Sequence, residues 1–459
     1  MYQKQKVGYG QAQRNHRWRQ RAPPLGFLVE QVDVADLAKP AKRYRSSAQV
    51  TNCELVASYN WLDIKQPTVM MPGAPPRWTP LAEPQELKED EGVYYRDKNA
   101  ARYPAHPMEP AARAVLTMHP EPLTKPVDVV ACGSTIGSLL RFVRGNERPF
   151  RMLVEMVGGV VHLIRRENSP TETIPNVKGF GHTFPETYTT WDASVRQSTS
   201  HQRVLRYDFA GLGCIVRHEG DGYLEDKLSP SSNRVPHSDD EQDSIDALAK
   251  GLDGSGITSK TPIHSSKLHL LSGGFPVPQT AVFDLKTRSM LRRGKDFLGE
   301  ELPRLWVAQI PNFILAYHER GTFTEMDVMD VSDKVKTWEA SMNRELSQLA
   351  ALLHRIVSLA RASKDGRLEV SRQALTTLEV RKQCAGVSPV FSADMMAKWK
   401  AWLAADAASE AGHDEDSNSE GDSDDDDDSD DGNLAWGEGG DGDYTACSEQ
   451  CSYCGRCTY

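Results

Sequence analysis

Short runs of apolar residues, many of them alternating with polar ones, recur through the middle of the chain. This period-two pattern is typical of β-strands. The paired glycines Gly158-Gly159 separate two such runs and predict a hairpin. The predicted strands are Leu55–Leu62, Val127–Cys132, Phe150–Val157, Val160–Arg165, His201–Phe209, Leu212–His218, Leu268–Ser272, Thr280–Thr287, Trp306–Ile310 and Asn312–His318.

Apolar residues spaced three or four apart predict helices elsewhere. The strongest such stripe covers residues 333–361 and indicates packing against a core. Further helices are expected at 109–118, 133–143, 296–305 and 392–405. Ser134 or Thr135 is expected to cap the second of these, where free backbone N–H groups could hold a phosphate, although plain capping is the simpler explanation of these residues. The pattern predicts an α+β fold with a mixed β-sheet core and flanking helices.

Composition and charge divide the chain further. The apolar content is 39% and the mean hydropathy is −0.54, which is low enough to predict disordered segments. Residues 1–50 carry ten Lys and Arg against three acids, whereas residues 406–443 carry seventeen acids and no base. We therefore expect a disordered basic arm (1–26), one domain (27–405) with a disordered insertion (225–266), an acidic disordered tail (406–443) and a Cys-rich end (444–459).

The termini bear on partners and location. A basic arm favours polyanions such as RNA, and the acidic tail is either solvated or competes for the same basic surface. No apolar run approaches the ~18 residues that a membrane span needs. The first thirty residues contain four arginines but no apolar signal core; a transit peptide is the alternative. We expect an intracellular protein, nuclear or cytoplasmic and not secreted.

The candidate chemistry lies on two predicted strands. Asp284 and Lys286 alternate along one strand and should share a face, as should Glu219 and Asp221 at the end of another. Three such acids would repel one another unless a divalent cation lay among them, and carboxylates suit Mg²⁺ or Mn²⁺. The simpler alternative for Asp284 and Lys286 is a cross-strand ion pair on a solvated face. An acid followed by acid-x-Lys on adjacent strands is the pattern of PD-(D/E)XK nucleases.

The order of these motifs resembles that of the DXO-type decapping exoribonucleases, a branch of that superfamily that acts on RNA 5′ ends. The resemblance covers roughly residues 127–330. It implies that Glu219, Asp221, Asp284 and the Leu285 carbonyl bind the metal, with Glu186 near them and Lys286 catalytic. The matching segments are Cys132-Gly-Ser-Thr, Phe150–Arg165, Gly181-His-Thr-Phe-Pro-Glu186, Glu219-Gly-Asp221, Asp284-Leu-Lys-Thr287 and Ile310–Gly321.

The chain also departs from that pattern. The family's first arginine has no equivalent at Ser134, although Arg141 and Arg144 lie nearby, and Asp284 replaces a glutamate. Pro185 splits the usual Phe-Glu pair. The family also has a glutamine on a helix, and Glu300, Glu301 or Gln309 could take its place here.

A second resemblance is to fungal proteins that contain segments similar to Tyr59-Asn-Trp-Leu62, Asn99–Pro104 and the Cys-rich end. They often carry the label of a geranylgeranyl pyrophosphate synthetase. Prenyl synthases are all-helical, with two Asp-rich motifs on core helices. Here the Asp-rich match, Asp424–Asp428, lies in an acidic run without apolar periodicity, which excludes that activity.

The last residues hold four closely spaced cysteines. Cys454-Gly-Arg-Cys457 fits the turn of a zinc site, but the other spacings are short for a self-contained one. Zn²⁺ binding, lipid modification and no function are the alternatives. The cluster consists of Cys447, Cys451, Cys454 and Cys457.

Together these observations predict a metal-dependent hydrolase acting on RNA 5′ ends, of the decapping, pyrophosphohydrolase or 5′–3′ exoribonuclease type. The alternative is a catalytically inactive nuclease-fold protein that serves as a binding or scaffold module.

Overall fold

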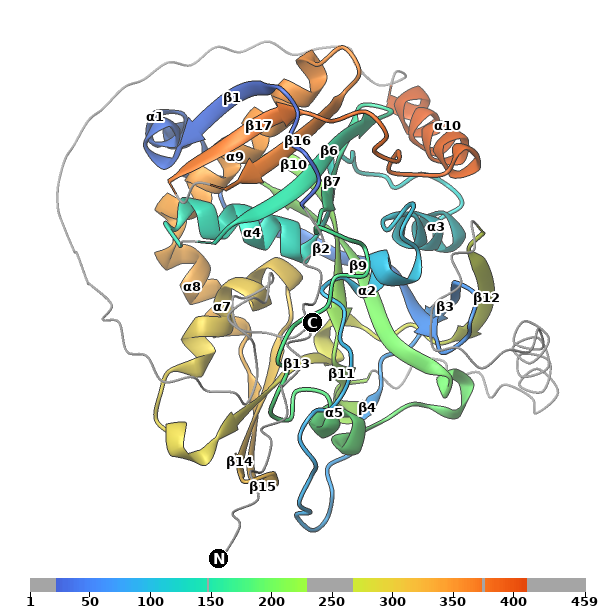
Figure 1. Cartoon of the computed structure of the whole chain (residues 1–459), viewed down its shortest axis with the longest axis vertical. Helices are drawn as coiled ribbons and strands as arrows, with labels where there is room; N and C mark the ends of the chain where they lie inside the picture. The colour runs from blue at the N-terminus through green and yellow to red at the C-terminus, as the bar shows by residue number, and fades with distance from the viewer. Residues whose placement is uncertain (1–21, 147, 229–266, 374–375, 411–459) are drawn as a thin grey trace, which may run out of the picture.

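The computed structural model describes residues 22–146, 148–228, 267–373 and 376–410. Within these ranges the strands form two sheets that meet near the centre of the molecule, and helices flank them (Figure 1). The expected α+β class with mixed sheets is confirmed. The acidic tail from residue 411 and the four clustered cysteines lie outside the described residues, as do residues 1–21 and 229–266.

The larger sheet has the order β1-β17-β16-β6-β7-β5-β10-β9-β2-β3-β12. Its central strands β7, β5 and β10 run parallel, and the outer pairs are mostly antiparallel. The strands are β1 (Leu28–Asp33), β2 (Val50–Leu62), β3 (Thr68–Gly73), β5 (Val129–Cys132), β6 (Phe150–Val157), β7 (Val160–Arg165), β9 (Ser198–Phe209), β10 (Leu212–Gly220), β12 (His269–Gly274), β16 (Arg367–Arg372) and β17 (Thr377–Lys382).

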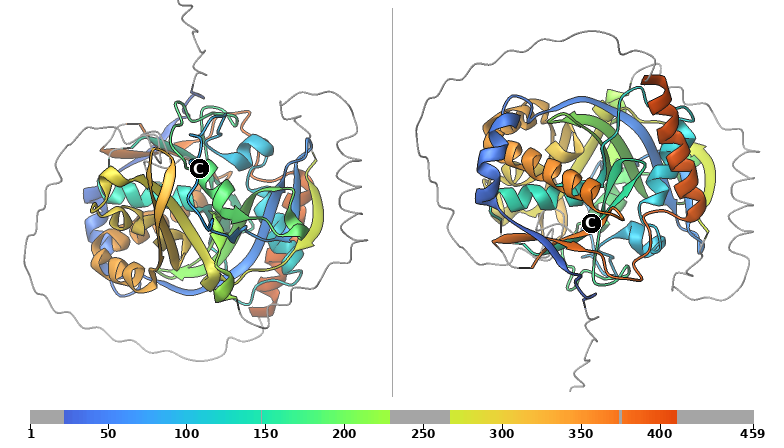
Figure 2. Two further views of the ribbon diagram at one scale, coloured as in Figure 1. Left: turned by 90° about the horizontal axis from the view of Figure 1, so that it is seen from below. Right: turned by 90° about the horizontal axis from the view of Figure 1, so that it is seen from above.

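Helices cover both faces of this sheet (Figure 2). Val129 and Ala131 of β5 pack into a core shared with α4 (Gly133–Val143) and α9 (Asn343–Ala362), whereas Val130 packs into a second core with α3 (Glu109–Met118) and α10 (Ala393–Glu410). This alternation follows from the period of two along a strand.

The smaller sheet has the order β15-β14-β13-β11-β4-β8. One of its faces packs against α7 (Phe297–Ala308), and the aromatic residues of α5 (Thr183–Tyr188) cover the other. Its strands are β4 (Arg77–Trp78), β8 (Thr189–Thr190), β11 (Gly222–Tyr223), β13 (Val282–Ser289), β14 (Asn312–Glu319) and β15 (Thr322–Asp330). The other described helices are α1 (Ala38–Ala41), α2 (Lys98–Arg102) and α8 (Ser332–Ser341).

The structure corrects several expected elements. Residues 306–308, predicted as a strand, end α7, because the buried Trp306 and Val307 continue the apolar face of that helix. The predicted helix 333–361 is two helices, α8 and α9, separated at Met342. Cys132 rather than Ser134 or Thr135 precedes α4, and its N–H donates to Thr135 Oγ1.

Two expected disordered segments are ordered at their edges. In the basic arm, the carbonyls of Pro23 and Gly26 accept hydrogen bonds from Arg151 and Arg381 of the large sheet. In the insertion, residues 225–227 form a 3₁₀ turn in which Glu225 pairs with Arg77 at 2.8 Å. None of the described helices is both long enough and apolar enough to cross a bilayer.

Candidate active site

The site forms where the chain leaves one sheet and enters the other. Strand β10 ends at Gly220 in the large sheet, and β11 begins at Gly222 in the small one. Strand β11 pairs with β13 through Gly222 and Phe283. Continuing this antiparallel register by one residue places Asp221 opposite Asp284. The change of sheets therefore brings together two carboxylates that are 63 positions apart.

The two aspartates affect each other electrostatically. Burial and the negative charge of Asp284 raise the pKa of Asp221 to about 7. The backbone N–H of Leu285 donates to Asp221 Oδ2 at 2.8 Å and so favours the ionised form, as do the charges of Lys286 and Arg304. Near neutral pH the pair therefore holds a proton in part of the molecules.

A buried charge network lies behind this pair. Arg304 of α7 forms an ion pair with Asp284, and its Nε donates to Glu301 Oε2 at 2.9 Å. The other Glu301 oxygen lies 3.5 Å from Arg288 Nη2. The Arg304, Lys286 and Arg288 charges hold the pKa of Glu301 below its usual value despite burial. Asp284 and Lys286 are 2% and 3% exposed, so they do not lie on a solvated face.

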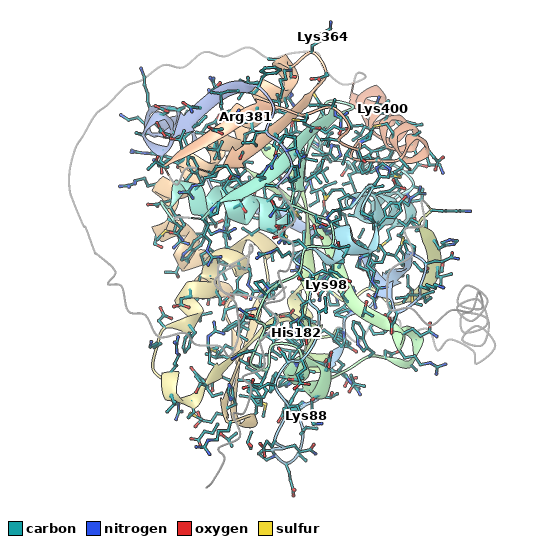
Figure 3. All side chains as sticks on the ribbon, in the orientation of Figure 1. Lys88, Lys98, His182, Lys364, Arg381 and Lys400 are labelled. Atoms are coloured by element: carbon teal, nitrogen blue, oxygen red, sulfur yellow. The ribbon has the colours of Figure 1, made fainter. Side chains whose placement is uncertain are left out.

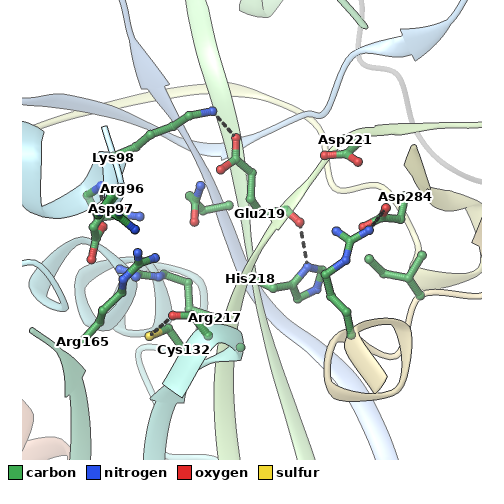
Figure 4. Close-up of a pocket in the computed structure, with 16 residues that line it drawn as sticks. Arg96, Asp97, Lys98, Cys132, Arg165, Arg217, His218, Glu219, Asp221 and Asp284 are labelled. Atoms are coloured by element: carbon green, nitrogen blue, oxygen red, sulfur yellow. Dashed lines mark hydrogen bonds and ion pairs between the residues drawn. The ribbon is translucent and has the colours of Figure 1, made fainter. Parts of the chain in front are cut away.

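Glu219 points away from the aspartates. Ile215 of β10 packs in the α3 core and Val216 in the α4 core, so alternation puts Arg217 and Glu219 on the α3 face. There Glu219 Oε1 accepts from Lys98 Nζ of α2 at 2.7 Å (Figure 4). The expected shared face of Glu219 and Asp221 is lost because the strand is interrupted at Asp221.

Arginines form the opposite wall of the same cleft. Arg96, Arg165 and Arg217 lie near the start of α4, whose Gly133 and Ser134 also line the cleft (Figure 4). Arg217 Nη1 donates to the Pro107 carbonyl at 2.8 Å, Arg96 pairs with Glu172 at 3.3 Å, and Arg165 pairs with Glu167 at 2.6 Å. The space in and around the cleft, with open solvent at its mouth included, is about 640 Å³.

Two segments noted in the sequence position this wall. Tyr59 and Trp61 of β2 both donate to Asn99 Oδ1 of α2, at 2.8 and 2.9 Å. Asp97 accepts from the N–H groups of Asn99 and Ala100 and so caps α2. Residues 59–62 and 99–104 therefore belong to one packing unit that fixes Lys98 and Arg96 at the cleft.

His218 lies in the cleft, whereas His182 does not. His218 is 3% exposed and lines the cleft; burial and the charges of Arg203 and Arg304 lower its pKa to about 3. Its Nδ1 donates to the Glu219 carbonyl, which leaves Nε2 as a buried acceptor without a hydrogen-bond partner among the described residues. His182, near the centre of Figure 3, is paired with Asp90 and stacked on Tyr94, away from the lining residues.

The donor set fits a hard divalent cation only in part. Asp221 and Asp284 supply two adjacent carboxylates whose repulsion a cation would relieve. In the part of the chain that the structure describes, no three His, Cys, Asp or Glu side chains surround a common position. Glu186 is exposed on α5 and does not line the cleft. Of the three candidates for the helix glutamine, Glu301 is the one in the buried network.

Reasoning from the sequence predicted Lys286 but missed the arginines of the site and Lys98. Arg217 follows the apolar run of its strand and Arg304 lies within the apolar segment Leu302–Ala308 of its helix, which is the signal of a buried charge with a specific role. Arg96, Lys98 and Arg165 give no such signal, because they reach the cleft only through the packing of α2 and β7.

The sequence of the chain matches a known family of domains. A family model described as "Domain of unknown function (DUF8563)" matches residues 31–376. The chain belongs to this family. No curated protein matches it.

Solved structures resemble the DUF8563 chain in fold. Rai1 of Scheffersomyces stipitis, in complex with (3′-NADP)+ and calcium ion, superposes with a TM-score of 0.51 at 9% identity, covering 83% of this chain and 100% of that one. S. pombe Rai1 in complex with 3′-FADP gives 0.44 at 11% identity (77% and 99% covered), and K. lactis Dxo1 with manganese gives 0.42 at 8% (81% and 97%). The resemblance to the DXO-type proteins is confirmed as one of fold.

Proposed function

We propose that the cleft binds the 5′ end of an RNA and hydrolyses a phosphoryl bond there with the aid of a divalent cation. The observation that carries this proposal is the Asp221–Asp284 pair beside Lys286, at the base of a cleft whose other wall is cationic. The S. stipitis relative in fold was crystallised with a dinucleotide and calcium, which supports a nucleotide and a hard cation as ligands.

The residues of each wall have separate tasks in this proposal. Arg96, Arg165 and Arg217 bind terminal phosphoryl oxygens, which guanidinium groups contact bidentately. Asp221, beside Asp284 at the base of the cleft, orients the attacking water by accepting a hydrogen bond from it. Lys286 stabilises negative charge that grows on the phosphoryl group.

Asp221, Asp284 and the Leu285 carbonyl would hold Mg²⁺ or Mn²⁺, and Glu219 would join them only after separating from Lys98. When bound, the cation neutralises charge on the phosphoryl oxygens and lowers the pKa of water. Glu186 remains a predicted contributor that would have to move toward the cleft.

The test uses the full chain with 5′-triphosphorylated, capped and NAD-linked RNA, in Mg²⁺ or Mn²⁺. Release of a phosphoryl product that Asp284→Asn lowers at least ~100-fold supports the proposal. Asp330→Asn is the matched control, because Asp330 also pairs with a cation, Lys227 at 2.8 Å, but lies on β15 outside the cleft. No product from any of the three RNAs contradicts hydrolysis.

A second candidate function is a binding module without turnover. The Arg304–Asp284 and Lys98–Glu219 ion pairs favour it, since each occupies a carboxylate that a cation would need. Tight binding of 5′-phosphorylated RNA with no product in either metal, and no heat of Mn²⁺ binding in calorimetry, would support this function over the first.

A further inference from the structure

Gln202 of β9 brings an unpaired amide to the cleft. The residue is 2% exposed, it lines the cleft, and its Nε2 has no hydrogen-bond partner among the described residues. A buried N–H donor without an acceptor lowers the stability of a fold, so the great majority of such groups are paired. An exception that borders a binding cleft points to a ligand that supplies the missing acceptor.

Gln202 is the middle member of a row of three side chains on neighbouring strands. Its register partners are Tyr59 on β2 and Glu219 on β10. Directly opposite residues of antiparallel strands share a face, with Cβ atoms about 4.5–5.5 Å apart, so the three side chains lie side by side. Consecutive residues of α2 bind the two outer members. Tyr59 donates to Asn99 Oδ1, and Glu219 accepts from Lys98 Nζ at 2.7 Å (Figure 4).

The Glu219 carboxylate is therefore an anion that lies between a cation and the unpaired amide. Glu219 and Lys98 are 23% and 30% exposed, and an ion pair so close to solvent contributes little to stability. A second anion can displace the carboxylate from Lys98 at small cost. When Glu219 turns away, its neighbour Gln202 is uncovered on that side. A phosphoryl group has several acceptor oxygens, so it can accept from the ammonium and from the amide together.

We propose that Lys98 and Gln202 form a subsite for a phosphoryl group, which the Glu219 carboxylate occupies in this structure. On binding, phosphoryl oxygens accept from Lys98 Nζ and Gln202 Nε2, and Glu219 leaves the ion pair. The inference rests on the proposed function in one respect, that a nucleotide enters the cleft with its terminal phosphoryl group on the arginines. The subsite then takes a second phosphoryl group, from the inner position of a 5′-diphosphate end or from the phosphodiester that follows the first nucleoside.

The experiment measures, by calorimetry in EDTA, the binding of three ligands to the full chain: uridine 5′-monophosphate, uridine 5′-diphosphate and 5′-phosphorylated diuridine. The ligand whose second phosphoryl group reaches the subsite should bind at least about fivefold more tightly than the monophosphate, and it identifies the source of that group. Gln202→Met should remove about a fivefold part of its affinity and leave monophosphate binding unchanged, because one hydrogen bond is lost.

Glu219→Gln gives a change of the opposite sign. It weakens the ion pair that competes with the ligand, so it should raise the affinity of the same ligand several-fold, and more than that of the monophosphate. A Glu219 side chain that only lines the wall would affect all three ligands equally, and this result overturns the subsite.

The controls separate binding from folding. Gln202→Met nearly keeps the side-chain volume and removes an unpaired buried amide, so the unfolding free energy should be unchanged or higher, whereas a structural role predicts a loss. Gln348 is the matched residue, because it is 7% exposed on α9, has an unpaired Oε1 and does not line the cleft. Gln348→Met should leave the affinity of all three ligands unchanged.

The outcomes are distinct from those of the hydrolysis test. Equal affinity of the three ligands, or a Gln202→Met variant that keeps the tighter binding, overturns the subsite while hydrolysis can still stand. Tighter binding that is lost in the 2′-deoxy form of the ligand also overturns it, because the amide then contacts a hydroxyl group. Tighter binding that depends on Gln202, without product from any RNA, supports the subsite and contradicts hydrolysis.

Discussion

The two walls of the cleft differ in how their charges are compensated. On the acidic wall, Asp284, Arg304, Glu301 and Arg288 form a closed network within a single stretch of 21 residues, on β13 and α7. On the arginine wall, Arg96, Arg165 and Arg217 come from three separate segments: Arg96 pairs with Glu172 at 3.3 Å, Arg165 pairs with Glu167 at 2.6 Å, and Arg217 donates to a neutral carbonyl. The acidic wall is therefore one buried network of shared ion pairs, whereas the arginine wall is a set of separate contacts to which an anion can be added. This contrast predicts stability effects on one side and affinity effects on the other.

The largest expected effect is on the acidic wall. Arg304→Met leaves Asp284 and Glu301 buried without their shared cation, which costs about 3–5 kcal/mol of unfolding free energy. Urea unfolding in EDTA measures the loss. Mn²⁺ should restore part of it in this variant, because Asp221 and Asp284 then lack a competing guanidinium.

Arg151→Met is the matched control, since it removes an arginine from the buried Glu369 without leaving two adjacent acids in a cleft. Arg151→Met should also lower the unfolding free energy, but Mn²⁺ should not restore the lost stability. Equal recovery of both variants would contradict a cation site at Asp221 and Asp284.

A smaller effect on the same wall depends on pH. The pKa of Asp221 is raised from 3.8 to about 7, so its contribution to stability is complete below pH 4 and is lost as the pH rises through 7. Asp221→Asn has no such loss. Its unfolding free energy relative to that of the unmodified chain should therefore rise between pH 4 and pH 8, in urea titrations in EDTA.

His162 and His218 act in the opposite direction, because their pKa values are lowered to about 4 and 3. Their contribution to the unfolding free energy is lost as the pH falls below about 6.5. Both proteins share these groups, so the difference isolates Asp221. A difference that stays constant with pH means that Asp221 is ionised throughout.

On the arginine wall the expected effect is on affinity. Arg165→Gln should weaken binding of a 5′-phosphorylated dinucleotide about tenfold, or ~1.4 kcal/mol. Arg381→Gln is closely matched, because both arginines lie on strands and donate through Nε to a glutamate two residues away, at 2.6 and 2.8 Å. Equal dinucleotide affinity in the two variants would remove Arg165 from the phosphate site.

The same contrast explains what the sequence could predict. Asp284 and Lys286 lie two positions apart on one strand, so the strand period predicts that they share a face. Glu301 and Arg304 lie three positions apart on α7, but no local period indicates that this helix packs on β13. The Asp221–Asp284 pairing required knowing that the strand changes sheets at residue 221, which no local period encodes. For the same reason Glu219, expected beside Asp221, faces Lys98 instead. The arginine wall depends on β2, α2, β7 and β10 converging, and only the buried position of Arg217 in an apolar strand hints at it.

Helices and strands were predicted correctly where the spacing of apolar residues is long and regular. They were predicted wrongly where the same residues fit both the spacing of a strand and that of a helix. The hairpin β6–β7 and helix α3 lie where expected. Trp306–Ala308 reads as a strand because its residues are bulky and apolar, yet it belongs to a helix, since Leu298, Leu305 and Trp306 share the buried face. Tertiary packing against α8 overrides the local preference there.

The smallest expected effect concerns the ion pair that links the two walls. Lys98 and Glu219 are 30% and 23% exposed, so Lys98→Met should change the unfolding free energy by less than about 1 kcal/mol. It frees the Glu219 carboxylate, which can then turn toward Asp221 and supply a third oxygen donor. Calorimetry should show a several-fold gain in Mn²⁺ affinity.

Lys227→Met is the control, because Lys227 is 31% exposed and pairs with Asp330 at 2.8 Å; it should show no gain in Mn²⁺ affinity. If Lys98→Met leaves Mn²⁺ affinity unchanged, Glu219 is part of the arginine wall only, and the cation site is limited to the two aspartates and the main chain.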